Sequence, residues 1–564
     1  MKNTPLKENS SLSSKAKNDL WRQVLAAIIC GALLWIAWPP HRVNFIIFFA
    51  LIPILWLEDR NPAADGKKST RFLLLAYLAL VVWNLLTTYW VSFATVAGAA
   101  AAILLNGLLM LIPVAFYRMI KSRAGRLAGY IALPSFWLMY EYLHFNWEAP
   151  WPWLALGNVW ATSTDWVQWY EFTGTAGGTV WVWTGNILIY ECLRAYRTYK
   201  LSENGSVNPA LRWLAAVIVM IQGPILLSHA VKPDDAPLDS PDNIVAVQPN
   251  IDPYTEKFAG NTVALQLKKL IDLSEEAIDS NTSLVMWPET AIAEDIQEGD
   301  WDFYSSLDMI ENFLRKHPQI KLLTGLTSFT KYQSEKRPTL SARQSGTPSI
   351  WYDVFNTAML MDTGGDYAVY HKSKLVPGVE VMPYPQVFSF LGSLMADLGG
   401  TAGGRGKQDS ASVFTVHEDL VIAPIICYES VFGEYVTEFV KRGASVLTII
   451  TNDGWWRNTD GYKQHMLYAR LRAIETRRFI ARSANTGISC FISETGDIID
   501  PTPGWVSAVI KSHYSSNEKL TFYVKHGDYI ARGAFWLGML LFIYALYLRI
   551  RGRKFGDNWF LLQK

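Results

Sequence analysis

Long apolar stretches dominate the N-terminal part of the chain and return once near its C-terminus. A helix needs about 20 predominantly apolar residues, range about 17–25, to cross a bilayer. Several of these stretches carry no charge over such a length, which indicates membrane spans rather than buried helices of a soluble protein. Eight spans are predicted, at residues 24–38, 44–57, 72–90, 96–117, 127–143, 177–192, 213–227 and 531–548.

Lysine and arginine gather in alternate loops between these spans. They are dense in the N-terminal tail and in residues 60–71, 118–126, 194–212 and 549–554, whereas the other short loops contain Arg42 alone. Short loops rich in Lys and Arg stay in the cytoplasm. Both termini are therefore predicted to be cytoplasmic, and seven crossings place the long segment before the last span outside.

This pattern divides the chain into five parts. They are a cytoplasmic tail (1–22), a seven-span transmembrane domain (23–232), an outer domain (243–527), an eighth transmembrane helix (531–549) and a second cytoplasmic tail (550–564).

The outer domain alternates short apolar runs with amphipathic segments. Strands are predicted at residues 244–248, 284–287, 321–326, 421–426, 445–451 and 485–492, and helices at 262–280, 302–316 and 462–482. Strands interleaved with helices of this length favour an α/β sandwich. The glycine-rich stretch 399–406 does not begin a helix, so it is interpreted as a lid or linker rather than a phosphate cradle.

Composition further narrows the functional classes to which the protein could belong. The 564 residues have a formal net charge of +1, which gives no indication of nucleic-acid binding. Of four cysteines, Cys427 and Cys490 fall in the outer domain, which would face an oxidising compartment. A disulfide between them is one interpretation. A working free thiol is the other, and the position of Cys427 at a strand exit favours it. No Cys/His spacing suggests zinc, and no metal or diffusible cofactor is expected.

The loop from 145 to 179 has no Lys or Arg but is rich in tryptophan. Tryptophan favours the boundary between membrane and water, so an interfacial belt is the simpler interpretation. The alternative is a loop that shapes a lipid entry face beside the outer domain.

Three motifs follow predicted strands of the outer domain. Trp287-Pro288-Glu289-Thr290 offers a carboxylate, Tyr370-His371-Lys372-Ser373-Lys374 an amine and Ile426-Cys427-Tyr428-Glu429 a thiol. A thiol needs a nearby base to become a useful nucleophile, and acyl transfer needs a cation or N–H donors for its oxyanion. Glu289, Lys372 and Cys427 would supply those parts.

These motifs resemble the Glu-Lys-Cys triad of the nitrilase superfamily. Their place between membrane spans, together with Val247–Asn250 and Asn452–Trp456, makes the whole chain similar to the apolipoprotein N-acyltransferases. The resemblance implies a multi-pass α-helical membrane domain with an αββα nitrilase-like sandwich outside.

The resemblance also implies roles for individual residues. Glu289 would be the general base, Lys372 would stabilise the oxyanion and help hold the thiolate, and Cys427 would be the nucleophile. Lys374 is the rival amine, but the family pattern Tyr-x-Lys-x-x-Leu-Val-Pro selects Lys372. Supporting roles fall to Glu380, Tyr428 and Glu429. Similar chains have Phe-Gly-Glu where this one has Gly378-Val379-Glu380.

The implied reaction moves an acyl chain from a membrane phospholipid to the N-terminal α-amino group of a diacylglyceryl-cysteine on an apolipoprotein, through a thioester on Cys427. The implied setting is a monomer in the cell inner membrane with a periplasmic catalytic domain. Two alternatives stay open. One is a membrane-tethered nitrilase or amidase, and the other is a non-catalytic protein that binds or scaffolds lipoproteins.

Overall fold

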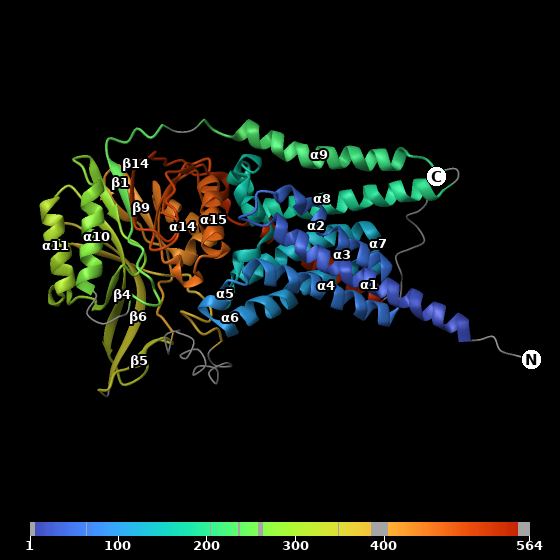
Figure 1. Ribbon diagram of the computed structural model, residues 1–564, viewed down its shortest axis with the longest axis horizontal. Helices are drawn as coiled ribbons and strands as arrows, with labels where there is room; N and C mark the ends of the chain where they lie inside the picture. The colour runs from blue at the N-terminus through green and yellow to red at the C-terminus, as the bar shows by residue number, and fades with distance from the viewer. Residues whose placement is uncertain are drawn as a thin grey trace, which may run out of the picture.

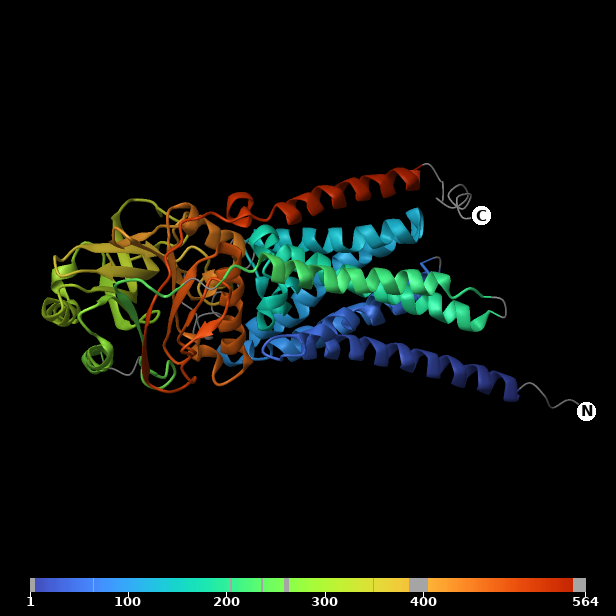
Figure 2. The same cartoon turned by 90° about the horizontal axis from the view of Figure 1, so that it is seen from above.

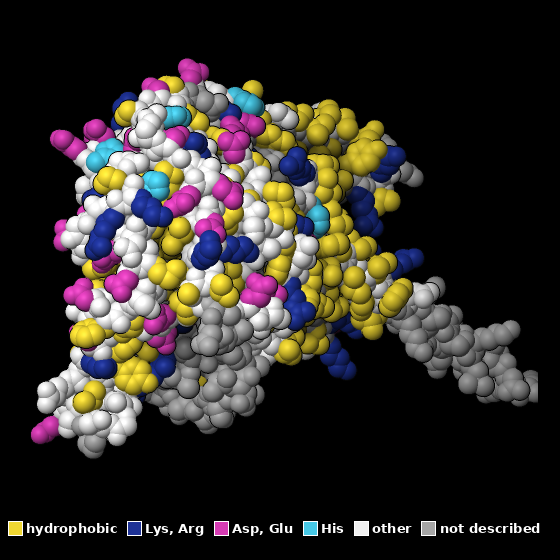
Figure 3. Space-filling model, turned by 60° about the vertical axis from the view of Figure 1, so that its left-hand side comes forward, with side chains coloured by type: hydrophobic (Ala, Val, Ile, Leu, Met, Phe, Trp, Pro, Cys, Tyr) yellow, Lys and Arg dark blue, Asp and Glu magenta, His cyan; other side chains and the backbone are white. Residues whose placement is uncertain are grey.

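A bundle of long helices stands against an α/β domain in the computed structural model (Figure 1). The structure describes residues 6–63, 65–202, 205–234, 237–257, 263–347, 349–384 and 404–550. The predicted glycine-rich lid or linker therefore lies mostly outside the described residues, as does the predicted tail 550–564 apart from its first residue. Apolar side chains cover the visible surface of the bundle, whereas the α/β domain carries mixed charges (Figure 3).

Ten α-helices make up the described part of the bundle and its connections. They are α1 (Leu6–Ala37), α2 (Ile47–Ala50), α3 (Ile52–Arg60), α4 (Gly66–Thr88), α5 (Val91–Ala94), α6 (Val96–Ala100), α7 (Asn106–Phe145), α8 (Tyr170–Leu201), α9 (Asn208–Val231) and α17 (Tyr529–Ile550). Helix α1 begins within the predicted tail 1–22. The described start of α1 and the end of α17 both lie at the end of the bundle away from the α/β domain (Figure 2).

Five helices among the described residues are long and apolar enough to cross a membrane, at Asn18–Ala37, Gly66–Thr88, Val96–Phe145, Asn208–Val231 and Tyr529–Ile550. The longest is two helices in space, because the backbone turns at Gly125 with φ 86°. Phe116 and Phe136, on the two sides of that turn, stack with ring centres 4.9 Å apart. The predicted spans 96–117 and 127–143 occupy these two arms.

The predicted span 44–57 is broken into a 3₁₀ turn (Asn44–Ile46), α2 and α3. Asn186 of α8 compensates for the break, since its side chain accepts a hydrogen bond from Leu51 N (2.9 Å) and donates one to Ile47 O (2.8 Å). Broken backbone at membrane depth needs such partners when it is buried in protein. The predicted span 177–192 lies within α8. Neither segment is among the five long apolar helices.

The α/β domain contains two β-sheets. The first has the order β14-β1-β2-β4-β6-β5, with β3 paired to β4 and β7 to β6, and the second has the order β13-β12-β11-β10-β9-β8. The first sheet comprises β1 (Asn243–Gln248), β2 (Thr282–Met286), β3 (Ile292–Gln297), β4 (Lys321–Gln333), β5 (Arg343–Gln344), β6 (Ile350–Met361), β7 (Tyr367–His371) and β14 (Ala508–His513). The second comprises β8 (Phe414–His417), β9 (Leu420–Ile426), β10 (Val446–Thr451), β11 (Phe479–Ala484), β12 (Cys490–Ile492) and β13 (Ile498–Ile499).

Helices cover the outer face of each sheet. Helices α10 (Val263–Ala277) and α11 (Ser305–Lys316) lie on the first sheet, and α14 (Gly433–Lys441) and α15 (Asp460–Thr476) on the second, facing the bundle (Figure 1). Along β1, Val245 and Val247 join the core under α10 and α11, whereas Ile244 and Ala246 join the core shared with the second sheet. The fold is therefore the expected multi-pass helical membrane domain with an αββα nitrilase-like sandwich.

One predicted helix and two predicted strands were wrong in extent. The strand expected at 321–326 continues to Gln333 as β4. The helix expected at 462–482 ends at Thr476, because Arg477 takes a left-handed conformation (φ 50°, ψ 52°). The following residues form the buried strand β11, and the strand expected at 485–492 is reduced to β12. The four arginines between 470 and 478 made the pattern look amphipathic, yet Arg472 and Arg478 are buried.

Candidate active site

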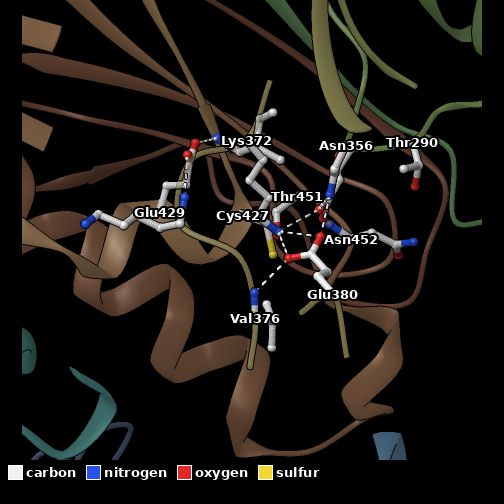
Figure 4. A network of polar contacts seen from close by, with 12 residues as sticks. Thr290, Asn356, Lys372, Val376, Glu380, Cys427, Glu429, Thr451 and Asn452 are labelled. Atoms are coloured by element: carbon white, nitrogen blue, oxygen red, sulfur yellow. Dashed lines mark hydrogen bonds and ion pairs between the residues drawn. The ribbon is translucent and has the colours of Figure 1, made fainter. Parts of the chain in front are cut away.

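The three sequence motifs meet because each follows the end of a strand. Glu289 comes three residues after β2, Lys372 directly after β7 and Cys427 directly after β9. All three side chains belong to buried residues, and Figure 4 shows Lys372, Cys427 and Glu380 close to one another. The structure thus brings together all three residues that the sequence selected, and Glu380 with them.

Two carboxylates share the Lys372 ammonium. Its Nζ lies 3.3 Å from Glu289 Oε1 and 3.0 Å from Glu380 Oε2. Asn356, on β6, donates its amide to both carboxylates at 2.8 Å. Backbone N–H groups complete the set, since Asn452 donates to Glu289 (2.9 Å) and Val376 to Glu380 (2.8 Å). Both carboxylates and the ammonium have several partners, which fixes their geometry, whereas the buried Oδ1 of Asn356 has no hydrogen-bond partner among the described residues.

This network sets the charge on its members. Burial opposes the charge of Lys372, but the carboxylates of Glu289 and Glu380 outweigh it and raise the pKa of the ammonium above its usual value. Burial likewise opposes ionisation of Glu380, yet Lys372 and Arg405 hold its pKa below the usual value. Lys372 is therefore a permanent cation at neutral pH.

Cys427 stands at a strained turn. Its backbone φ is 51°, in the left-handed region that non-glycine residues avoid, and a 3₁₀ turn (Cys427–Val431) begins there. Thr290, directly after Glu289, is also left-handed at φ 49°. Strain of this kind costs about 1–3 kcal/mol per residue and clusters at functional sites.

The thiol of Cys427 is neutral at rest. Burial, and then the Glu289 carboxylate, raise its pKa well above the usual value, while the Lys372 ammonium lowers it by less. Lys372 alone therefore does not hold a thiolate, because its charge is already shared between two carboxylates. To act as a nucleophile, this thiol would therefore need a base to take its proton.

Glu429 joins the two halves of the site. One carboxylate oxygen accepts hydrogen bonds from Tyr370 Oη and Ser373 N, each at 2.7 Å, and the other accepts one from Ile426 N at 2.9 Å. The loop that carries Lys372 is thereby attached to the turn that carries Cys427. Tyr428 donates to Pro150 O (2.9 Å) and so links that turn to the helical bundle.

A buried polar cluster supports the Cys427 turn from behind. His465 lies 2.9 Å from Asp453 through Nδ1 and 2.9 Å from Ser430 Oγ through Nε2. Arg482 donates to Asp453 at 2.6 Å. Donor atoms of Cys427, Asp453 and His465 lie within 4.8 Å of one another, a spacing that a metal ion could use. We interpret the cluster as structural, because the Arg482 guanidinium already neutralises the Asp453 carboxylate.

Lys374, the rival amine, lies elsewhere. Its Nζ stands 5.1 Å from the ring centre of Tyr435 and 5.5 Å from that of Phe432. Two further residues at the site were missed from the sequence. Asn356 interrupts an apolar run, which was the available signal, and Lys257 is a buried amine hydrogen-bonded to the Thr290 hydroxyl. Burial lowers the pKa of Lys257 to about 8.

The four cysteines are free in the structure, so the alternative of a Cys427–Cys490 disulfide is not realised. The simpler interpretation of the tryptophan-rich loop was wrong in part, since Trp153 and Trp160 are fully buried. Trp153 packs against Trp456 (5.4 Å between ring centres), and Trp151 stacks on Tyr428 (6.4 Å). Trp151, Trp153 and Trp456 therefore form an aromatic wall between the bundle and the Cys427 turn.

Comparisons with known proteins agree with this arrangement. The carbon-nitrogen hydrolase family model matches residues 244–516, and the model of the apolipoprotein N-acyltransferase N-terminal domain matches residues 30–188. The apolipoprotein N-acyltransferase of Chlorobaculum tepidum is 29% identical over 514 residues, covering 89% of this chain and 92% of that protein. That of Thermotoga maritima is 25% identical over 553 residues, covering 95% and 96%. This chain belongs to the apolipoprotein N-acyltransferase family.

The chain is accordingly an acyltransferase enzyme and a multi-pass membrane protein of lipoprotein maturation. Among solved structures, a mutant of the Nesterenkonia AN1 amidase from the nitrilase superfamily is similar, at 15% identity and a TM-score of 0.36. The match covers 54% of this chain and 99% of the amidase.

Proposed function

We propose that this enzyme takes its acyl chain from a membrane phospholipid and carries it as a thioester on Cys427. The acceptor is the N-terminal α-amino group of a diacylglyceryl-cysteine on an apolipoprotein. The observation that carries this proposal is the buried site in which Glu289 and Lys372 contact each other beside the Cys427 thiol. We also place the enzyme in the inner membrane, as a monomer with its catalytic domain in the periplasm.

The first half-reaction forms the thioester. Glu289 accepts the thiol proton as the sulfur attacks the ester carbonyl, and the Lys372 ammonium stabilises the oxyanion. The carbon–oxygen ester bond then breaks, and Glu289 returns the proton to the leaving oxygen of the lysophospholipid. Glu380 and Asn356 hold Lys372 and Glu289 in position through the contacts described above.

The second half-reaction forms the amide. The neutral α-amino nitrogen attacks the thioester carbonyl, Lys372 again stabilises the oxyanion, and Glu289 takes the proton that the nitrogen loses. The carbon–sulfur bond breaks, and the proton passes to the Cys427 sulfur. Thioesters are good acyl donors to amines, and an apolar site disfavours the competing attack of water. The aromatic wall of Trp151, Trp153 and Trp456 supports that exclusion.

Mass spectrometry of the Cys427 peptide tests the proposal. With phospholipid alone, the wild type is expected to accumulate a hydroxylamine-sensitive acyl adduct on Cys427 and to release lysophospholipid, whereas Cys427→Ser accumulates little or none. Cys490→Ala, a change of a buried thiol on β12, is the matched control and behaves as wild type. A diacylglyceryl peptide with a free amino terminus discharges the adduct, and one with a blocked amine does not. An adduct that needs both substrates at once would contradict the two-step reaction.

Two further measurements, of amide hydrolysis and of lipoprotein maturation, separate the rival functions. An amidase would hydrolyse small amides and leave phospholipid intact, and a scaffold would tolerate Cys427→Ala without loss of lipoprotein maturation.

A further inference from the structure

A cationic and aromatic cluster lies outside the catalytic network, where the helical bundle meets the α/β domain. Three separate segments build it: Phe93 from α5, Tyr254 from the loop after β1, and Trp455 with Arg457 from the 3₁₀ turn Asp453–Trp456 and the residue after it. The Arg457 guanidinium carbon lies 5.4 Å from the ring centres of both Phe93 and Tyr254. We call these four residues the Arg457 cluster.

Hydrogen bonds hold the cluster together. The Tyr254 hydroxyl lies within hydrogen-bond distance of two carbonyl oxygens, Phe93 O at 2.9 Å and Trp455 O at 2.8 Å, so its one O–H links the three segments. The rings of Tyr254 and Trp455 meet edge to face at 5.4 Å. The cluster is thus prearranged rather than a chance gathering of mobile surface side chains.

The cluster is nevertheless open to its surroundings. Phe93, Tyr254 and Trp455 are 40%, 43% and 37% exposed, and Arg457 is exposed as well. Within the described part of the chain, no carboxylate forms an ion pair with Arg457. Lys463, six residues later, is paired with Asp460 at 3.4 Å. An unpaired guanidinium framed by exposed rings is suited to an external anion with an apolar part.

The backbone at Arg457 is strained. Its φ of 52° and ψ of −163° fall in a region that glycine occupies far more readily than arginine. Hydrogen bonds from Arg457 N to Gly454 O (3.0 Å) and from Thr459 N to Arg457 O (2.9 Å) hold this conformation. The strain presents the arginine side chain over Phe93 and Tyr254.

The position of the cluster indicates what the anion is. Helix α5 connects two helices that are long and apolar enough to cross a membrane, Gly66–Thr88 and Val96–Phe145. It lies at their end nearest the α/β domain (Figure 1), where lipid headgroups would meet the protein. The segment that carries Arg457 also reaches the catalytic network. Asn452 N, five residues before Arg457, donates to Glu289, and the ring of Trp456 lies 5.7 Å from that of His465.

We propose that the Arg457 cluster binds the phosphate of the phospholipid acyl donor. The guanidinium presents paired N–H donors to phosphate oxygens, and the exposed rings contact the glycerol and the start of the acyl chains. The site recognises the phosphodiester that all glycerophospholipids share rather than one headgroup. Arg457 is a binding residue and takes no part in the chemistry at Cys427. This inference rests on the proposed phospholipid donor.

Binding to the full-length Cys427→Ala protein in uncharged detergent tests the site without catalysis. The probes are dihexanoylphosphatidylglycerol and dihexanoylglycerol, which lacks the phosphate, titrated by calorimetry. Arg457→Gln is expected to weaken binding of the phospholipid about tenfold and leave the diacylglycerol unchanged, because a charge-assisted pair is lost. Arg457→Lys falls between, since it keeps the charge but not the paired donors. Lys463→Gln, the matched control, leaves both affinities unchanged.

Steady-state transfer gives the second readout. In the enzyme that retains Cys427, Arg457→Gln is expected to raise the apparent KM for phospholipid in mixed micelles about tenfold and to change kcat by less than about twofold. This is the pattern of a variant that loses substrate binding but no contact made only in the transition state. Equal weakening of both lipids, equal effects of Lys463→Gln, or no effect of Arg457→Gln would each overturn the proposal. A wild type that binds phospholipid through Arg457 yet never forms the Cys427 adduct would refute the donor reaction and leave the binding site standing.

Discussion

Lys372 and Lys374 stand two positions apart in one loop and have different surroundings. Lys372 is buried between Glu289 and Glu380, whereas Lys374 lies over the rings of Phe432 and Tyr435. Removing an oxyanion donor typically costs about 10²–10³ in rate. We expect Lys372→Ala to abolish detectable acyl transfer and Lys374→Ala to be much milder, in an assay of peptide acylation. The reverse ranking would show that the wrong lysine has been assigned.

Glu429 offers a prediction about pH. Burial raises its pKa to about 7, although hydrogen bonds from Tyr370, Ile426 and Ser373 oppose the shift. An unfolded glutamate titrates near 4.3, so between about pH 4.5 and 7 the folded state binds more protons than the unfolded one. The free energy of unfolding therefore falls as pH rises through this window.

Glu429→Gln cannot titrate and should lose that part of the decline. Thermal unfolding midpoints at pH 5 and pH 8 measure it, and we expect a smaller drop in the variant than in the wild type. Glu475 and Asp528, whose pKa values burial raises to about 7 and about 6, stay in both proteins and contribute to the remaining slope. Identical slopes would mean that Glu429 does not titrate in this range.

At the scale of single residues, the sequence selected three residues that the structure brings together, and Glu380 beside them, but not Asn356. Glu289, Lys372 and Cys427 could be selected because their motifs carry the resemblance. Asn356, which contacts both carboxylates, could be noticed only as a polar residue in an apolar strand. Its partners come from segments far apart in the chain, and no local pattern reports such a contact.

Among the elements, β4 supports the segment that carries Glu289 at very close range. A Cβ atom at Gly325 would lie 2.5 Å from Thr290 N and 2.6 Å from Glu289 Cα, so an added methyl group must displace the backbone at Glu289. Displacing a reacting group by about 1 Å can cost about 10²-fold in rate. We expect Gly325→Ala to lower acyl transfer by that order, with about 1–3 kcal/mol lost from overpacking.

The matched control is Gly346→Ala, where nothing lies within 4 Å of the added atom. Transfer rates and thermal midpoints of both variants check the prediction together. If Gly325→Ala kept wild-type transfer, the position of Glu289 would not depend on its contact with β4.

Element boundaries were predictable where apolar periodicity is local, and the exceptions have physical causes. Strands β1, β2 and β9 lie within a residue or two of the predicted strands, because each is a short apolar run bounded by polar residues. Strand β11 was taken for helix because buried arginines such as Arg482 mimic a polar face. Arg482 forms an ion pair with Asp453, a residue on another element, so its burial could not be inferred from the surrounding sequence.

Across the whole molecule, helix α8 runs from the α/β domain to the basic loops and contacts both. Thr175 N, near its start, donates a hydrogen bond to the carboxylate of Glu475 on α15 at 3.0 Å. Glu191, farther along the same helix, pairs with Arg126 at 2.8 Å, and Arg126 also pairs with Asp59 of α3 at 3.0 Å. At about 1.5 Å per residue, Thr175 and Glu191 lie about 24 Å apart along α8, close to the depth of a hydrocarbon core.

The basic loops and the α/β domain therefore occupy opposite ends of the bundle. Because loops rich in Lys and Arg stay in the cytoplasm, we expect the α/β domain to face the periplasm. Reporter fusions after Lys200, which follows this basic end, and after Ser280, within the α/β domain, should report opposite compartments. Weakening the excess of positive charge in this loop offers a second test. Neutralising Arg194 and Arg197 together should reduce the fraction of correctly oriented Lys200 fusions. Both fusions on one side of the membrane would contradict this orientation and, with it, access of periplasmic lipoproteins to Cys427.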